Sequence, residues 1–238
     1  MKIAAISDIH GNLPALQAVL ANIEKQGADR IFCAGDLVGY GPQPNEVIAL
    51  LKEKRIPVVM GNYDDAAGFE RIVCGCDYQE EREQLLGERS LNWTKENLAP
   101  KAKEFLQSLP FQLCVSVEAL NLLVVHGSPR RLNEYLYEEF PESELIEMLA
   151  QNNADILVCG HTHLPYHRRP GDRHVINAGS AGRPKHGDPD ALYALLEITG
   201  AAVRVELRKV GYDYEAAAKA IEQSGLPAEF AVQLRTGK

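Results

Sequence analysis

Short apolar runs bounded by turn residues recur along the chain and predict buried strands. The six clearest runs cover residues 2–7, 30–35, 56–61, 121–127, 155–160 and 174–179. Between the first three runs, residues 13–25 and 45–54 carry apolar side chains at helical spacing and predict two helices. This alternation of strand and helix predicts parallel strands joined by right-handed crossovers, which places the chain in the α/β class.

Residues 65–109 interrupt the alternation because they contain no clear strand. Their polar, helix-forming composition predicts two or three helices separated by Gly87 and Pro100. We interpret this segment as a helical cap inserted into a single domain that spans residues 1–238.

The second half of the chain predicts two strand pairs and two helical regions. A hairpin is expected to turn near residues 118–121, and a helix is expected over residues 142–154. A second pair of strands is predicted to turn at residues 199–200. The tail from Asp213 is predicted to be helical and to cover an edge of the sheet.

Residue types that bind cations follow the ends of the apolar runs. In open α/β sheets, ligand sites form at the carboxyl ends of the strands. Residues two apart in an extended chain project to the same side, so each D-x-H or H-x-H pair is expected to reach one centre. The candidate metal ligands are Asp8, His10, Asp36, Asn62, His126, His161 and His163.

The chemistry of this set narrows the choice of ion. Four imidazoles, two carboxylates and one amide suit manganese, iron, zinc or nickel, whereas magnesium and calcium prefer oxygen ligands alone. Seven ligands exceed what one ion needs if positions must stay open for a substrate. The set therefore favours two ions that share a bridging ligand.

Five motifs in this order resemble the calcineurin-like metallophosphoesterase superfamily: "SDIHGN", "AGDLVGYG", "GNYDD", "VVHGS" and "CGHTH", between residues 7 and 163. The later "INAGSAGRP" is similar to a stretch found in its small bacterial and archaeal phosphodiesterase branch. The resemblance implies a four-layer αββα sandwich with a dinuclear centre. It also implies that one ion binds Asp8, His10, Asp36 and His163, and that the other binds Asp36, Asn62, His126 and His161.

Such a centre implies a metal-dependent phosphoric ester hydrolase in which a metal-bridging hydroxide attacks a small phosphodiester or nucleotide-type substrate. Manganese is the first choice of metal, with iron, zinc, nickel or cobalt as alternatives. A phosphomonoesterase, a dinucleoside polyphosphate hydrolase and a non-catalytic metal-binding interaction scaffold on the same fold remain as alternative functions. The candidate catalytic residues are Asp36, Asn62, Tyr63 and His126, and the candidate phosphate contacts are Arg130 and Arg183.

Tyr63 departs from the family pattern, in which a histidine follows the asparagine and protonates the leaving oxygen. A phenol has an ordinary pKa of ~10 and is a poorer proton donor than imidazole near neutral pH. Either Tyr63 donates weakly, or a group such as His174 or His186 replaces it, or the natural leaving group needs little protonation.

Composition and charge limit the partners. The formal net charge of −8 argues against an extended nucleic-acid surface or an anionic-membrane surface, both of which need clustered Lys and Arg. No apolar stretch approaches the ~18 residues of a membrane span. Five scattered cysteines fit a reducing cytoplasm better than a disulfide framework. A small phosphorylated substrate is the expected partner, and the oligomeric state is left open.

Overall fold

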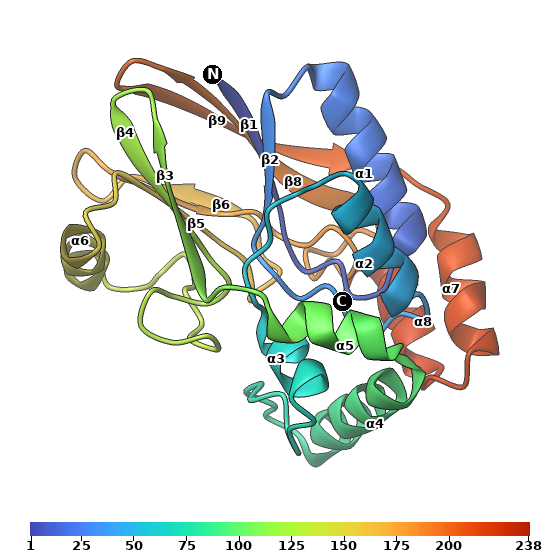
Figure 1. The fold of residues 1–238 in the computed structure, drawn as a ribbon. Coiled ribbons are helices and arrows are strands. Elements are labelled where there is room, and N and C mark those ends of the chain that lie inside the picture. The colour runs from blue at the N-terminus through green and yellow to red at the C-terminus, as the bar shows by residue number, and fades with distance from the viewer.

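Two β-sheets pack face to face and carry helices on their outer faces in the computed structural model, which describes residues 1–238 (Figure 1). The strands are β1 (Lys2–Ile6), β2 (Arg30–Cys33), β3 (Gln112–Val117), β4 (Leu120–Val125), β5 (Ile156–Cys159), β6 (Tyr166–Arg168), β7 (His174–Asn177), β8 (Ala191–Thr199) and β9 (Ala202–Val210). The helices are α1 (Leu13–Gln26), α2 (Pro44–Glu53), α3 (Asn62–Gly68), α4 (Glu81–Asn97), α5 (Pro100–Gln107), α6 (Glu142–Gln151), α7 (Tyr214–Gln223) and α8 (Glu229–Thr236).

Both sheets are mixed, which corrects the expectation of a simple parallel sheet. The first has the order β2-β1-β8-β9, and only β1 and β2 are parallel. The second has the order β3-β4-β5-β7-β6, with β4, β5 and β7 parallel and an antiparallel strand at each edge. The apolar run at residues 56–61 is not a strand, because only Val58 forms a bridge, with Cys33. The run still lies against β2 in the parallel sense.

Buried apolar side chains form a separate core in each interlayer space. The two sheets meet through β-branched and aromatic side chains such as Ile3, Phe32 and Val158. A larger core joins the first sheet to α1, α2, α7 and α8, and a smaller one joins the second sheet to α6. These three cores separate four layers, so the predicted αββα sandwich is confirmed. None of the helices is both long enough and apolar enough to cross a membrane.

Three helices, α3, α4 and α5, lie in the region that we interpret as an insertion, and the first of them begins at Asn62, before residue 65. Pro100 does start a new helix, but the expected break at Gly87 is wrong because α4 runs through it. Gly87 is required by packing instead: a Cβ at this position would collide with the phenol of Tyr78. The glycine therefore lets Tyr78 approach the helix backbone closely.

The helical tail lies beside α1 rather than at a sheet edge. Helices α7 and α8 pack against each other, and α7 contacts α1 (Figure 1). Phe230 of α8 is buried and meets the ring of Tyr40 edge-on at 5.0 Å. The end of the chain therefore reaches the loops that follow β1 and β2.

Candidate metal centre

The loops that follow β1, β2, β4 and β5 meet at one end of the sandwich. The backbone N–H of Asp8 donates to the carbonyl of Gly35 at 2.9 Å, and that of His10 donates to the carbonyl of Asp36 at 3.0 Å. The N–H of Gly160 donates to the carbonyl of His126 at 2.9 Å. Backbone hydrogen bonds therefore fix the ligand-bearing loops to one another without using the ligand side chains.

The D-x-H and H-x-H pairs are not extended, so the extended-chain argument was wrong. Asp8, His10, His161 and His163 have φ values of 53°, 49°, 66° and 61°, and Asp36 has 54°. These are left-handed conformations, which are uncommon for residues with a side chain and concentrate at functional sites. As a result, His161 and His163 face different groups of ligands.

Two glycines allow the ligand-bearing loops to pack closely against one another. A Cβ on Gly61 would collide with the backbone N–H and carboxylate of Asp36, and a Cβ on Gly160 would collide with the side chains of Ser7 and Asp8. Both carboxylates can therefore lie directly against the neighbouring backbone.

The first group of candidate ligands consists of Asp8, His10 and His163, whose facing atoms carry no hydrogen. Nδ1 of His10 donates to the carbonyl of Val38 at 2.9 Å, and Nδ1 of His163 donates to that of Arg183 at 2.5 Å. A neutral imidazole has one N–H, so each Nε2 presents a lone pair. These Nε2 atoms lie 3.2 Å apart, and Oδ1 of Asp8, which is buried without a hydrogen bond, lies 3.3 Å from Nε2 of His163. Such converging acceptors are what a cation requires.

The second group forms around His126. Its Nδ1 lies 2.8 Å from the carbonyl of Ala34, so its Nε2 is turned inward. That Nε2 lies 2.9 Å from Oδ1 of Asn62 and 3.2 Å from Nδ1 of His161. The amide of Asn62 is oriented by its Nδ2, which donates to the carbonyl of Cys74 at 3.0 Å. The asparagine therefore presents its oxygen, the atom able to bind a metal.

Asp36 lies between the two groups. Its Oδ2 is 3.7 Å from Nε2 of His10 and 3.4 Å from Nε2 of His126. Its Oδ1 accepts a hydrogen bond from the backbone N–H of Tyr63 at 2.8 Å, which fixes the orientation of the carboxylate. A single carboxylate oxygen thus faces an imidazole from each group.

Burial and neighbouring charges set the protonation of these side chains. Burial lowers the pKa of both His10 and His161 to about 3, so both imidazoles are neutral at pH 7. Although burial opposes it, the Asp36 carboxylate raises the pKa of His126 to about 9. A cation bound in the second group would therefore displace a proton from His126.

The donor set fits two divalent transition-metal ions. Buried ligand atoms fall into two sets, within each of which all atoms lie within 4.8 Å of one another. Mixed imidazole and carboxylate donors suit manganese, iron or zinc, and the unpartnered Oδ1 of Asp8 is a buried charge that needs a cation. The sets are Asp8, His10 and His163, and Asp36, His126 and His161.

A cavity of 250 Å³ opens beside the candidate metal ligands. Its wall draws on the loops after β1 and β2, the inserted segment, the loop after β4 and helix α8. Five aromatic side chains line it, namely Tyr40, Tyr63, Tyr78, Tyr135 and Phe230. The space beside the centre is therefore bounded by aromatic rings as well as by polar groups.

Tyr63 belongs to the cavity wall, but its hydroxyl is already engaged. The oxygen lies 3.2 Å from the hydroxyl of Tyr78 and donates to the carbonyl of Gly87 at 3.4 Å. Burial, followed by the neighbouring Tyr40 and Tyr78, raises the pKa of Tyr63 well above its ordinary value. This makes the phenol a weaker acid than the sequence suggested. The alternative donors His174 and His186 do not line the cavity.

Only one of the two candidate phosphate-binding arginines lies at the cavity. Arg183 lines the cavity. Arg130 does not line it: its guanidinium is paired with Glu134 at 2.7 Å and with Glu144 at 3.1 Å. The arginine nearer to His126 along the chain is thus the one turned away from the centre.

Several residues on the cavity wall had no signal in the sequence. Tyr78 and Tyr135 belong to loops without a recognisable motif, and Phe230 comes from the tail. Lys185 also lines the cavity. It lies two positions after Arg183 in the stretch that follows the Gly-Ser turn, and this proximity is the one sequence feature that could have identified it.

Comparison with known proteins agrees with this geometry. The family model for the calcineurin-like phosphoesterase superfamily domain matches residues 1–201. The chain is 30% identical to an uncharacterized protein of Methanocaldococcus jannaschii, over 99% of this chain and 98% of the relative. It is 29% identical to the phosphodiesterase YfcE of Escherichia coli, over 83% of this chain and 88% of the relative.

A solved metallophosphoesterase from Sphaerobacter thermophilus has the same fold. It superposes with a TM-score of 0.80 at 29% identity, over 100% of this chain and 99% of that chain. The family match, the similar structure and the two ligand groups lead to one assignment. The chain belongs to the calcineurin-like phosphoesterase superfamily and is a metal-dependent phosphoric ester hydrolase.

Proposed function

We propose that the chain is a dinuclear phosphoesterase that hydrolyses a small phosphodiester or nucleotide-type substrate, with Asp36 bridging the two ions. The observation that carries the proposal is the position of Oδ2 of Asp36, which lies 3.7 Å from His10 and 3.4 Å from His126. When bound, two such ions supply an acidified water and positive charge for the phosphoryl oxygens. The similarity to a phosphodiesterase of Escherichia coli supports the diester class.

The residues of this chain position the reacting groups. Asp8, His10 and His163 would hold one ion and Asn62, His126 and His161 the other. The hydrogen bonds from Nδ1 of His10, His126 and His163 to backbone carbonyls fix these three rings, which lets each bind through its Nε2. Arg183 would contact substrate from the cavity wall.

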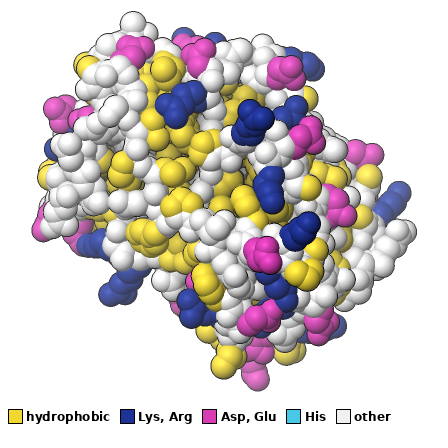
Figure 2. All heavy atoms as spheres, in the orientation of Figure 1, with side chains coloured by type: hydrophobic (Ala, Val, Ile, Leu, Met, Phe, Trp, Pro, Cys, Tyr) yellow, Lys and Arg dark blue, Asp and Glu magenta, His cyan; other side chains and the backbone are white.

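We also propose that the partner is a small phosphorylated substrate and that the location is the cytoplasm. Lys, Arg, Asp and Glu side chains are interspersed on the face drawn in Figure 2, which supports a small substrate rather than an extended nucleic acid. All five cysteines are free, which supports a reducing cytoplasm. Manganese is the proposed ion, and the mixed imidazole and carboxylate donors suit it as they suit iron and zinc.

Hydrolysis of bis-p-nitrophenyl phosphate with manganese tests the proposed function. We expect nitrophenolate release that depends on added metal. Metal content should be measured on the same sample. A protein loaded with metal that shows no turnover with any of manganese, nickel, cobalt, zinc or iron would contradict the proposal.

Replacement of Tyr63 by histidine is expected to raise hydrolysis of p-nitrophenyl phosphate and of alkyl monoesters. An imidazole at this position titrates near neutral pH, and a positioned general acid contributes about 10²-fold or more, so we expect an increase of about tenfold. The largest gain is expected for the alkyl esters, whose leaving groups need a proton. The measurement is kcat for each ester.

Tyr63→Phe is the matched control. It removes only the hydroxyl, which is bound to the inserted segment, and it should not raise the monoesterase rate. If Tyr63→His folds and binds metal but its rate on alkyl esters stays at the wild-type level, position 63 does not serve the leaving group.

A further inference from the structure

Two cationic side chains on the cavity wall have no acidic partner. Besides the C-terminal Lys238, the wall contains Arg183 and Lys185, and no carboxylate lies within ion-pair distance of either of these two. Some cations elsewhere in the chain are paired, as Lys103 is with Glu70 at 2.5 Å and Lys209 with Asp188 at 2.7 Å, whereas exposed ones such as Lys101 form no ion pair. Arg183 and Lys185 differ from those exposed cations because they border the cavity beside the candidate metal ligands.

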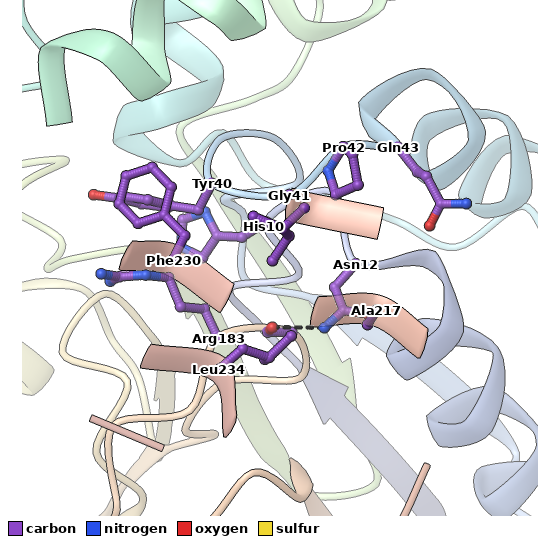
Figure 3. A pocket seen from close by; sticks show the side chains of 12 residues that line it. His10, Asn12, Tyr40, Gly41, Pro42, Gln43, Arg183, Ala217, Phe230 and Leu234 are labelled. Atoms are coloured by element: carbon purple, nitrogen blue, oxygen red, sulfur yellow. Dashed lines mark hydrogen bonds between the residues drawn. The ribbon is translucent and has the colours of Figure 1, made fainter. Parts of the chain in front are cut away.

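Arg183 is held rigidly beside the first group of ligands. Its carbonyl accepts the Nδ1–H of His163, and its guanidinium lies 3.9 Å from the centre of the Tyr40 ring. Nη2 donates to Oε1 of Gln233 at 2.8 Å, whereas the buried Nε has no partner. Figure 3 shows the guanidinium beside the rings of Tyr40 and Phe230. Stacking and one neutral hydrogen bond orient the cation but leave its charge uncompensated.

Lys185 adds a second charge close to the first. It lies at the mouth of the cavity, where protein atoms crowd the side chain but solvent still reaches it. This crowding, followed by repulsion from Arg183, lowers the pKa of Lys185 to about 8. The carboxylates of Asp77 and Glu83 are also on the wall, but neither forms an ion pair with Lys185. An anion between the two cations would relieve their repulsion.

The charge of the centre indicates which anion this would be. Two divalent ions and the carboxylates of Asp8 and Asp36 leave a net charge of about +2, which a hydroxide and one phosphate diester, each with one negative charge, would neutralise. Arg183 and Lys185 lie outside this balance, and neither forms an ion pair with the Asp77 or Glu83 carboxylate on the same wall. A substrate with another anionic group would balance the positive charges of Arg183 and Lys185.

We propose that Arg183 and Lys185 form a subsite for a second phosphate or carboxylate of the substrate, distinct from the ester cleaved at the metal centre. This inference rests on the proposed function. It narrows the substrate class to phosphate esters with an additional anionic group, such as a nucleotide phosphorylated at two positions.

Two chromogenic substrates that differ by one phosphate test the subsite. Thymidine 5′-(p-nitrophenyl phosphate) carries only the reacting diester, and its 3′-phosphorylated form adds a second anion. We expect the manganese-loaded wild type to prefer the 3′-phosphorylated form by about tenfold or more in kcat/KM, as a charge-assisted hydrogen bond provides. Lys185→Met should lose this preference and keep its rate on the simpler substrate, and Lys185→Arg should restore it.

Lys101→Met is the matched control, because Lys101 is an exposed lysine in α5, outside the cavity. It should behave as the wild type on both substrates. Two results would overturn the subsite: a wild type with no preference for the added phosphate, or a Lys185→Met variant that loses both activities equally. The second result would assign Lys185 to the reacting phosphate instead.

Binding of inorganic pyrophosphate and inorganic phosphate gives a readout that does not depend on turnover. Calorimetry on the metal-loaded protein should show that Lys185→Met weakens pyrophosphate about tenfold more than phosphate. Equal weakening of the two anions, or none, would contradict the subsite. Absence of hydrolysis combined with this selective weakening would refute the proposed function and leave the anion subsite standing.

Discussion

Asp36→Asn is expected to lower kcat/KM for bis-p-nitrophenyl phosphate by about 10³-fold, because it removes the shared negative charge between the ligand groups. The substitution keeps the shape of the side chain. The amide oxygen can still accept the backbone N–H of Tyr63, so the loop after β2 should keep its conformation. The measured metal content should fall at the same time, since both ions are expected to depend on this carboxylate.

Asp65→Asn is the matched control for this variant. Asp65 lies three residues beyond Asn62 on α3 and forms a surface ion pair with Arg71 at 2.8 Å. Such exposed pairs contribute ~0–1 kcal/mol, so activity and metal content should stay close to wild type. An Asp36→Asn protein with full metal content and wild-type turnover would mean that the carboxylate does not bridge.

Removal of metal by a chelator is expected to lower the Tm by about 10 °C, because metal at a thousandfold excess over its Kd stabilises by ~4 kcal/mol. The physical reason lies in the geometry of the centre. Without a cation, the lone pairs of His10 and His163 face each other at 3.2 Å, and the buried Oδ1 of Asp8 has no partner. Five of the seven ligand residues also occupy left-handed backbone conformations. Scanning calorimetry before and after chelation measures the difference, and added manganese should restore the Tm.

The Asp36→Asn variant serves as the control for the thermal measurement. Its Tm should respond much less to the chelator than that of the wild type, because it should hold less metal. An unchanged wild-type Tm, with complete metal removal verified by elemental analysis, would show that the ligand groups do not depend on a cation for stability.

The sequence predicts that the candidate ligands lie together because they follow apolar runs. Asp8 and Asp36 come directly after strand-forming segments, and parallel strands bring their carboxyl ends to one edge. The run at residues 56–61 was wrongly predicted to be a strand. Asn62 still reaches the centre because this run lies parallel to β2. Hydrophobic patterning therefore predicts which residues converge better than it predicts regular hydrogen bonding.

Loop conformations were not predictable from spacing. The D-x-H and H-x-H patterns fit an extended chain, but their left-handed residues are held by hydrogen bonds to distant loops, such as that from the N–H of His161 to Oδ2 of Asp8. Likewise, Gly87 marks a helix break in isolation, but it serves the packing of Tyr78. In each case a tertiary contact determines the outcome, and no local pattern encodes it.

The residues that line the cavity could not be predicted from the sequence either, because they come from segments far apart in the chain. Phe230 and Gln233 come from α8, and Tyr78 comes from the inserted segment. Neither segment carries a catalytic motif. The position of the tail depends on apolar contacts with α1 and Tyr40, which a periodic pattern can suggest only as an amphipathic helix.

An anomalous difference map from crystals of the manganese-loaded protein tests the dinuclear centre most directly. We expect two peaks ~3.5–4 Å apart, both in contact with Asp36, one beside His10 and the other beside His126. A single peak, peaks away from these side chains, or no peak in crystals grown with saturating manganese would contradict the account.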